Sequence, residues 1–279
     1  MTDSTPVPAS PTFPPEQLFS ETGPVPPDET RFAHLPSVYH ITTWKAGSTW
    51  VQGVLTEIAP DRVLVPEPAV ADGIEFSDVV PGRIYTPLYI NRPRFDASPF
   101  AAVPHRKFVV LRDLRDTLVS WYFSLAKTHG ENPEVLMHRH ELRKMSKEDG
   151  LLYLLNHPHF YGLSMIGSTW LRSTDAIVIR FESLIENPHR WFRLILDECG
   201  IEAAEDQFAD ALNRQSFEAL AKRPRGTEGV SHYRRGVAGD WKGHFSDRIA
   251  REFARRYDDL VVKSGYEPTL GRHGVFHST

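Results

Sequence analysis

The stretch that decides the fold, residues 38–50, reads VYHITTWKAGSTW. It passes from a short apolar run, typical of a buried strand, through a polar loop into a helical repeat of apolar residues. Backbone N–H groups at the start of a helix face outward and bind anions. Lys45 adds a positive charge, Gly47 allows close approach of the backbone, and Ser48 and Thr49 add hydroxyl donors. The stretch therefore predicts a phosphate-binding loop between a strand and a helix.

The order of residues separates this loop from the one that binds nucleoside triphosphates. The triphosphate loop has two glycines separated by four residues, followed by Lys and then Ser or Thr, whereas here Lys45 precedes the single Gly47. The order Lys-x-Gly-Ser/Thr-Thr-Trp resembles the 5′-phosphosulfate loop of sulfotransferases that use 3′-phosphoadenosine 5′-phosphosulfate (PAPS). Taken alone, the same residues are also compatible with an ordinary strand-to-helix turn. The resemblance implies that the nucleotide is bound here by Lys45, Ala46, Gly47, Ser48, Thr49 and Trp50.

The composition is typical of a globular protein. The chain has 279 residues, of which 41% are hydrophobic, and its net charge of −4 argues against wholesale binding to nucleic acid or to an anionic membrane. Its single cysteine, Cys199, excludes an intramolecular disulfide framework and suits a reducing compartment. The sequence contains no apolar run long enough to span a membrane, and residues 1–4 lack the features of a signal peptide. We therefore expect a cytoplasmic protein, and an oligomer is left open.

Prolines divide the chain into a tail and a body. Residues 1–35 contain eight prolines, which disfavour regular structure and favour an extended arm. The remaining residues, 36–279, alternate apolar runs typical of strands with helical repeats. This alternation predicts one α/β domain with a central parallel sheet flanked by helices. Ligands of such sheets bind at the carboxyl ends of the strands, where the P-loop-like segment lies.

A second constellation begins where the predicted strand 107–112 ends. Arg112 closes the strand, and Ser120 lies about two turns into the helix that follows. An Arg at a strand end and a Ser on the next helix could bind one phosphate, the Arg through bidentate contacts. The spacing resembles that of the sulfotransferase 3′-phosphate site. The alternative is that Arg112 pairs with Asp116 and that Ser120 is ordinary helix surface.

A third constellation, residues 234–242, reads RRGVAGDWK. Two adjacent arginines and a glycine turn suit a phosphate, because guanidinium groups and backbone N–H groups can both reach it. The string resembles the late motif of the same family, which completes the 3′-phosphate site. This resemblance is the most specific in the chain, and it implies that Arg234, Arg235 and Gly236 bind the nucleotide.

Aromatic residues provide a weaker fourth signal. By resemblance, Trp50 and Phe217 would sandwich the adenine by stacking. Phe181 falls where the family usually has a Tyr beside the base. A core role remains the alternative for each aromatic residue taken singly.

The catalytic base is where the resemblance fails. Cytosolic sulfotransferases carry Lys-Thr-His-Leu-Pro, whose His is the base, but here Arg83 and Tyr85 stand at the Lys and His positions when Pro87 is aligned with the family Pro. A Tyr with an unperturbed pKa near 10 is a poor base at neutral pH. Other sulfotransferase branches use a Glu after the loop's helix, and Glu67 is the best-placed equivalent. We therefore expect catalysis by Lys45, Glu67, Tyr85 and Arg83, with Glu67 as the base.

The leading interpretation is a PAPS-dependent sulfotransferase that acts on a hydroxyl or amine of a small-molecule or carbohydrate acceptor. The second product would be 3′-phosphoadenosine 5′-phosphate (PAP). No metal is expected, because Lys and Arg supply the positive charge and no His, Cys or Asp spacing predicts ligands. The alternatives are a P-loop-like kinase or hydrolase, with Asp113 holding Mg²⁺, and a catalytically inactive PAPS- or PAP-binding module.

Overall fold

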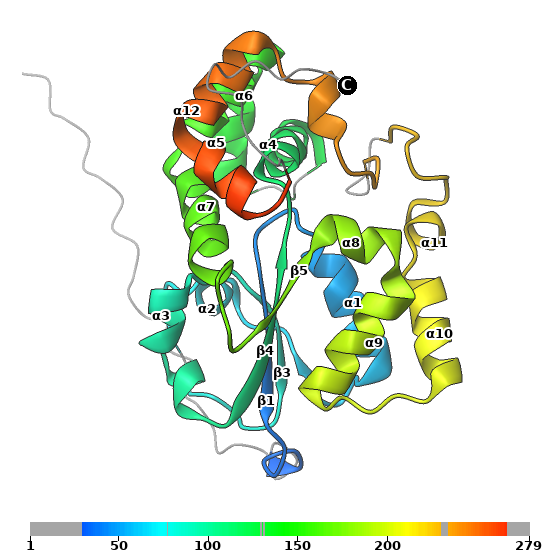
Figure 1. Ribbon diagram of the computed structural model, residues 1–279. Helices are drawn as coiled ribbons and strands as arrows, with labels where there is room; N and C mark the ends of the chain where they lie inside the picture. The colour runs from blue at the N-terminus through cyan, green and yellow to red at the C-terminus, as the bar shows by residue number, and fades with distance from the viewer. Residues whose placement is uncertain (1–29, 77, 129, 131, 230–233, 267–279) are drawn as a thin grey trace, which may run out of the picture.

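The computed structural model describes residues 30–266, except 77, 129, 131 and 230–233. Most of the predicted tail, residues 1–29, lies outside the described residues. Within them, one parallel sheet has the strand order β2-β3-β1-β4-β5, as Figure 1 shows. Its strands are β1 (Ser37–Thr42), β2 (Val63–Leu64), β3 (Ile84–Leu88), β4 (His105–Leu111) and β5 (Ile177–Arg180). The predicted fold class, a central parallel sheet within an α/β domain, is confirmed.

The strands alternate their side chains between two apolar layers, which explains why they read as nearly continuous hydrophobic runs. Val38, Phe108 and Val110 enter one buried cluster, whereas Tyr39 and Val109 enter another on the opposite face. Burial on both faces leaves the strand ends as the open part of the sheet. The site is built at those ends.

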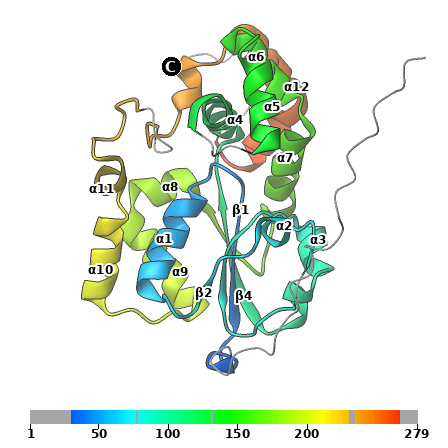
Figure 2. The ribbon, with the colours of Figure 1, turned by 180° about the vertical axis from the view of Figure 1, so that it is seen from behind.

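Helices connect successive strands and cover the sheet (Figures 1 and 2). Among the described residues, the α-helices are α1 (Ser48–Ile58), α2 (Pro68–Ala71), α3 (Arg92–Asp96), α4 (Leu114–Phe123), α5 (Pro133–Leu142), α6 (Lys147–Leu155), α7 (Pro158–Trp170), α8 (Phe181–Glu186), α9 (Pro188–Cys199), α10 (Glu205–Arg214), α11 (Phe217–Ala221) and α12 (Asp247–Lys263). The shorter turns are η2 (Pro99–Ala102), the π-helix η3 (Ser124–Thr128) and η4 (Asp240–Gly243).

The helices form three groups around the sheet. Helices α1, α8, α9 and α10 share one buried cluster with the sheet, and α3, η2 and α7 share another. Helices α4, α5, α6, α7 and α12 form a third cluster beyond the carboxyl ends of the strands. This helical group closes the site from the side opposite to the sheet.

Local signals explain several helix boundaries. Asp113 and Ser146 cap α4 and α6 by accepting hydrogen bonds from backbone N–H groups. Gly200 ends α9 with a left-handed φ of 62°. Cys199, the last residue of α9, lies in the core. Each of these signals is local, and each could be read without knowledge of the tertiary structure.

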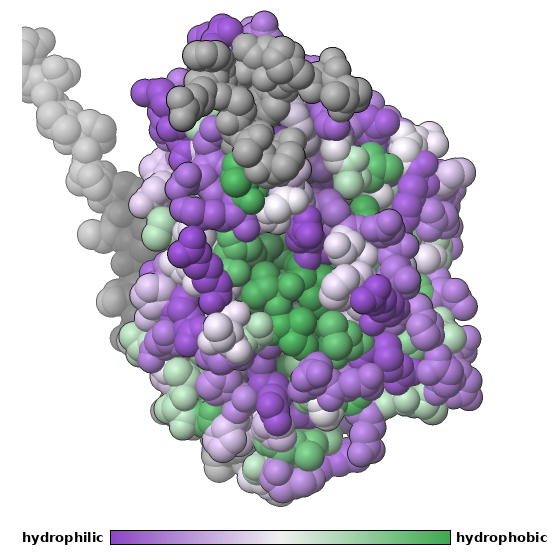
Figure 3. All heavy atoms as spheres, in the orientation of Figure 1, coloured by the Kyte–Doolittle hydropathy of each residue, from purple (hydrophilic) through white to green (hydrophobic). Residues whose placement is uncertain are grey.

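On the face shown in Figure 3, apolar side chains gather near the middle of the molecule, in the region of β5 and the neighbouring helix ends. Within the described ranges, no helix is both long enough and apolar enough to cross a membrane.

Candidate active site

The loop after β1 wraps around the start of α1 in a conformation that only a few residue types adopt readily. Gly47 has φ of +79°, and an added Cβ there would lie 2.5 Å from the Phe181 ring. Lys45 also has a positive φ, 68°, which is uncommon for a residue with a side chain. Ala46 is fully buried, whereas Gly47, Ser48, Thr49 and Lys45 line the cavity described below. The loop therefore turns its donors, and not Ala46, toward the ligand space.

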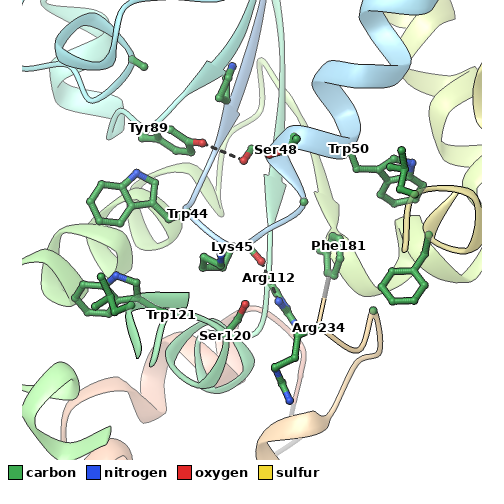
Figure 4. Close-up of a pocket in the computed structure, with 18 of the residues that line it drawn as sticks. Trp44, Lys45, Ser48, Trp50, Tyr89, Arg112, Ser120, Trp121, Phe181 and Arg234 are labelled. Atoms are coloured by element: carbon green, nitrogen blue, oxygen red, sulfur yellow. Dashed lines mark hydrogen bonds between the residues drawn. The ribbon is translucent and has the colours of Figure 1, made fainter. Parts of the chain in front are cut away.

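Lys45 is the cation at the centre of the loop (Figure 4). Its ammonium donates a hydrogen bond to Ser124 Oγ at 3.1 Å. Burial, followed by the nearby Arg112 guanidinium, lowers the pKa of Lys45 to about 8. A phosphate group placed against this ammonium would reverse that shift, because an anion favours the protonated form.

This pKa makes nucleotide affinity pH-dependent. Above pH 8 the free protein must take up a proton at Lys45 to bind an anion, so PAP affinity is expected to fall as pH rises through about 8. Phosphate groups are already ionised there, since their second pKa is about 6. Calorimetry of PAP binding across this range tests the prediction. A Lys45→Gln variant should lose the dependence, and an unchanged slope in that variant would assign it to another group.

Arg112 joins the loop to the rest of the site. Its Nη1 donates to the Lys45 carbonyl at 2.9 Å, and its guanidinium lies 5.0 Å from the centroid of the Phe181 ring. The alternative pairing with Asp116 is present but loose, at 3.8 Å. Asp116 instead accepts hydrogen bonds from the backbone of Gly239 and Trp241. That carboxylate thereby ties α4 to the late motif.

The late motif is held by one buried carboxylate. Arg234 and Arg235 both pair with Asp240. Burial alone would raise the pKa of Asp240, but hydrogen bonds from His244 and Arg234 hold it well below its ordinary value. At Gly236, where φ is +66°, an added Cβ would lie 2.5 Å from the Phe217 ring. The motif therefore presents its arginines in a fixed geometry.

Two guanidinium nitrogens at this end of the site have no hydrogen-bond partner in the described part of the chain, although one of them, Arg234 Nη1, lies 4.0 Å from a Glu228 carboxylate oxygen. They are Arg112 Nε and Arg234 Nη1, and both are buried. A buried N–H group without an acceptor costs free energy. A bound anion could accept hydrogen bonds from both of these N–H groups and remove that cost. With Ser120, which also lines the cavity, these groups fit a phosphate.

One cavity of about 670 Å³ contains these groups. Of the residues expected to bind the nucleotide, every one except the buried Ala46 lines it. Arg225, which the sequence does not single out, also lines it, with its guanidinium 6.0 Å from the Trp50 ring centroid and 5.7 Å from that of Phe217. The Arg225 guanidinium therefore lies close to both rings that are expected to stack on the adenine.

The other end of the cavity is aromatic. Figure 4 shows Trp44, Tyr89 and Trp121 on the side of Lys45 opposite to Trp50. The Tyr89 hydroxyl donates to Ser48 Oγ at 2.9 Å, and the Trp44 and Tyr89 rings pack edge to face. None of these three residues carries a sequence signal of its own. They become recognisable only when β3 and α4 are placed beside the loop.

A carboxylate, Asp72, lies at this aromatic end. It lines the cavity just after α2, and its Oδ1 accepts a hydrogen bond from Trp44 Nε1 at 3.4 Å. Burial raises its pKa. Asp72 follows α1 in the chain, five residues beyond Glu67, the residue expected to be the base.

The structure corrects the expected catalytic set. The Glu67 side chain is exposed and does not line the cavity. Tyr85 is buried in the sheet, where its hydroxyl accepts from Val80 N at 2.7 Å. Arg83 points a guanidinium nitrogen toward the Val63 carbonyl, outside the cavity lining. Alternation along β3 explains the error at Tyr85, because its side chain faces the core layer.

The kinase alternative needs Asp113 to hold Mg²⁺, but this carboxylate binds other groups of the protein. Asp113 accepts from the backbone N–H of Arg115 at 2.9 Å and pairs with its guanidinium at 2.7 Å. Both side chains are buried, and neither lines the cavity. The helix cap and the ion pair therefore account for Asp113.

Three histidines come together beside the aromatic end. His138, His157 and His159 have ligand atoms within 4.8 Å of one another, and His138 is buried. Their spacing in the sequence gives no metal signal, since two separate helices bring them together.

Comparisons with known proteins agree with this geometry. A family model described as "Sulfotransferase domain" matches residues 36–265. The 3-alpha-hydroxysteroid sulfotransferase of Cavia porcellus is 26% identical over 259 residues, which cover 82% of this chain and 84% of that protein. The 3-beta-hydroxysteroid sulfotransferase of the same animal is 26% identical over 205 residues, or 67% of this chain and 66% of that protein.

Solved structures share the fold at low sequence identity. A mouse sulfotransferase complexed with PAP has a TM-score of 0.60 at 16% identity, covering 86% of this chain and 94% of that one. Retinol dehydratase in a complex with retinol and PAP has a TM-score of 0.51 at 14% identity, with coverage of 88% and 86%. Together with the family match over most of the chain, the phosphate-binding loop and the two clustered arginines lead to one conclusion: the chain belongs to the sulfotransferase domain family and is a PAPS-dependent sulfotransferase.

Proposed function

We propose that the acceptor is a small, largely apolar molecule with a hydroxyl group, rather than a carbohydrate. The observation that carries this proposal is the lining of the cavity at the Trp44 end. Its apolar members are Trp44, Val65, Pro66, Pro68, Ala71, Tyr89, Trp121, Leu125 and Val135. Apolar and aromatic walls with a few polar groups bind apolar ligands and orient their polar atoms. The hydroxysteroid sulfotransferases among the relatives act on acceptors of this kind.

At the nucleotide end, different residues would bind the two phosphate groups and the base. Ser48 and Thr49 would hold the 5′-phosphate, while Arg112, Ser120, Arg234, Arg235 and Gly236 would hold the 3′-phosphate. Trp50, Phe181 and Phe217 would surround the base. The support is their common position on the cavity wall and the two buried guanidinium nitrogens, Arg112 Nε and Arg234 Nη1, that lack a hydrogen-bond partner among the described residues.

Asp72 takes the role of the base that the family His usually has. When bound, PAPS supplies the sulfuryl group, which passes to the acceptor oxygen as the bond between sulfur and the 5′-phosphate oxygen breaks. The Asp72 carboxylate accepts the proton that leaves the acceptor hydroxyl. Lys45 stabilises negative charge on the departing phosphate oxygen, as preorganised donors do at developing anions. A carboxylate in the cavity also argues against the inactive binding module.

Acceptor preference tests the proposal. With labelled PAPS, apolar alcohols and phenols are expected to show kcat/KM at least about tenfold above that of mono- and disaccharides. The reason is that apolar and aromatic side chains outnumber the polar ones at this end, which are Asp72, Asn132, Glu134, His138 and His159. Thin-layer separation of labelled products from a mixed acceptor pool measures this directly. Preferential labelling of sugars would refute the assignment.

A cytoplasmic location is proposed on the composition. The single cysteine, Cys199, is buried in the core as a free thiol. Fractionation of the source cells, followed by detection with an antibody, tests this location.

A further inference from the structure

The cluster of His138, His157 and His159 joins two helices at the acceptor end of the cavity. His138 lies on α5, whereas His157 caps α7 and His159 lies in its first turn. Their ligand atoms lie within 4.8 Å of one another. Glu134, one turn before His138, brings its carboxylate 3.0 Å from His159 Nδ1 and 3.6 Å from His138 Nε2. Three imidazoles and one carboxylate therefore converge on one small volume.

The two ring nitrogens of His138 differ in their hydrogen bonding. Only 1% of the residue is exposed, and its Nδ1 lies 3.0 Å from the Tyr153 hydroxyl. Its Nε2 is buried and has no hydrogen-bond partner among the residues that the structure describes. Ligating histidines almost always engage the second ring nitrogen in this manner, which fixes the ring orientation. The free Nε2 faces the Glu134 carboxylate.

The other two histidines complete the set. His157 Nδ1 accepts the backbone N–H of His159 at 3.3 Å, which leaves Nε2 as the available ligand atom. The ring centroid of His157 lies 4.8 Å from that of His138 and 4.9 Å from that of His159. The three imidazole rings therefore pack against one another where α5 meets the start of α7.

We propose that Glu134, His138, His157 and His159 form a binding site for a divalent transition-metal ion of the Zn²⁺ class. Imidazole nitrogens with one carboxylate suit Zn²⁺ or Co²⁺, whereas Mg²⁺ and Ca²⁺ require mainly oxygen ligands. Ligand atoms in a tetrahedral zinc site lie closer together than 4.8 Å, so small side-chain rotations accompany binding. Glu134, His138 and His159 also line the cavity. The bound ion links α5 to α7. It also places positive charge on the wall of the acceptor end, and not at the nucleotide end.

Metal binding is measured on the full chain without a histidine tag, after removal of metal by a chelator. Competition with a chromophoric chelator should show one Zn²⁺ per chain, and excess Mg²⁺ should not displace it. Zn²⁺ should also raise the melting temperature, because it binds the folded state. Co²⁺ should give the strong visible absorption of a tetrahedral site. These readouts need neither PAPS nor an acceptor, so they stand apart from the proposed function.

The variants separate a metal site from an ordinary hydrogen-bonded cluster. His157→Asn keeps a side-chain acceptor at the helix N-cap and removes the imidazole, and His159→Gln removes an exposed ligand. Each is expected to weaken Zn²⁺ at least about 100-fold, since even outer partners of metal ligands are worth 10–100-fold. His140→Gln replaces an exposed histidine of α5, the helix that carries Glu134 and His138, and this variant should bind Zn²⁺ normally. Wild-type affinity in both ligand variants, or equal loss in the His140 control, would overturn the proposal.

Discussion

Replacing Asp72 by Asn is expected to lower kcat by about 10²–10⁴-fold, the range that general-base assistance provides. Asn keeps the shape of the side chain and removes its basicity. Asp72 lies at the acceptor end and contacts Trp44, away from the arginines proposed to bind the 3′-phosphate. PAP affinity should therefore change little. Steady-state kinetics and PAP calorimetry on the same preparation measure the two effects.

The pH profile provides a second reading of the same residue. Asp72 must be ionised to accept a proton, and burial raises its pKa above the ordinary value. Turnover should thus fall on acidification at a higher pH than an exposed Asp would give, and this limb should disappear in Asp72→Asn. Glu67→Gln is the matched control, because Glu67 is an exposed carboxylate on the same segment. Full activity in Asp72→Asn, with loss in Glu67→Gln, would restore the assignment made from the sequence.

Replacing Lys45 by Ala is expected to lower kcat by about 10²–10³-fold, as loss of one preorganised donor does in other enzymes. Negative charge grows on the departing phosphate oxygen during transfer, so the ammonium acts more strongly in the transition state than in the bound ground state. PAP binding near neutral pH should weaken by a smaller factor. Lys144→Ala, which removes an exposed lysine, should behave as wild type. A Lys45→Ala enzyme with near-normal kcat and weakened PAP binding would make Lys45 a binding residue only.

The nucleotide end could be predicted from the sequence because its groups lie in short contiguous motifs. The loop from Lys45 to Trp50 and the motif around Arg234 depend on backbone geometry that specific residues impose, such as the positive φ at Gly47. The order and spacing of the residues in these two motifs are therefore enough to predict the loop conformation. Ala46 is the exception, because a position inside a motif does not reveal which way a side chain points.

The acceptor end could not be predicted in the same way. Asp72, Tyr89 and the histidine cluster come from separate segments that only the packing of α2, α5 and α7 brings together. Glu67 has the chemistry expected of a base, but the short helix α2 begins directly after it and leaves its side chain in solvent. Helix α5 has little apolar periodicity, so its sequence resembles a surface excursion. Tertiary packing, rather than local propensity, decides these positions.

Recognition of the 3′-phosphate is the central property expected of the nucleotide site, and calorimetry tests it most directly. PAP and adenosine 5′-phosphate differ only in that group, which Arg112, Ser120 and Arg234 would bind. Hydrogen bonds to charged groups contribute about 1.5–3 kcal/mol each, and about 1.4 kcal/mol corresponds to a tenfold change in affinity. PAP should bind at least about tenfold more tightly than adenosine 5′-phosphate, and Arg234→Ala should narrow the difference. Equal affinity of the two nucleotides for the wild-type protein would contradict the account.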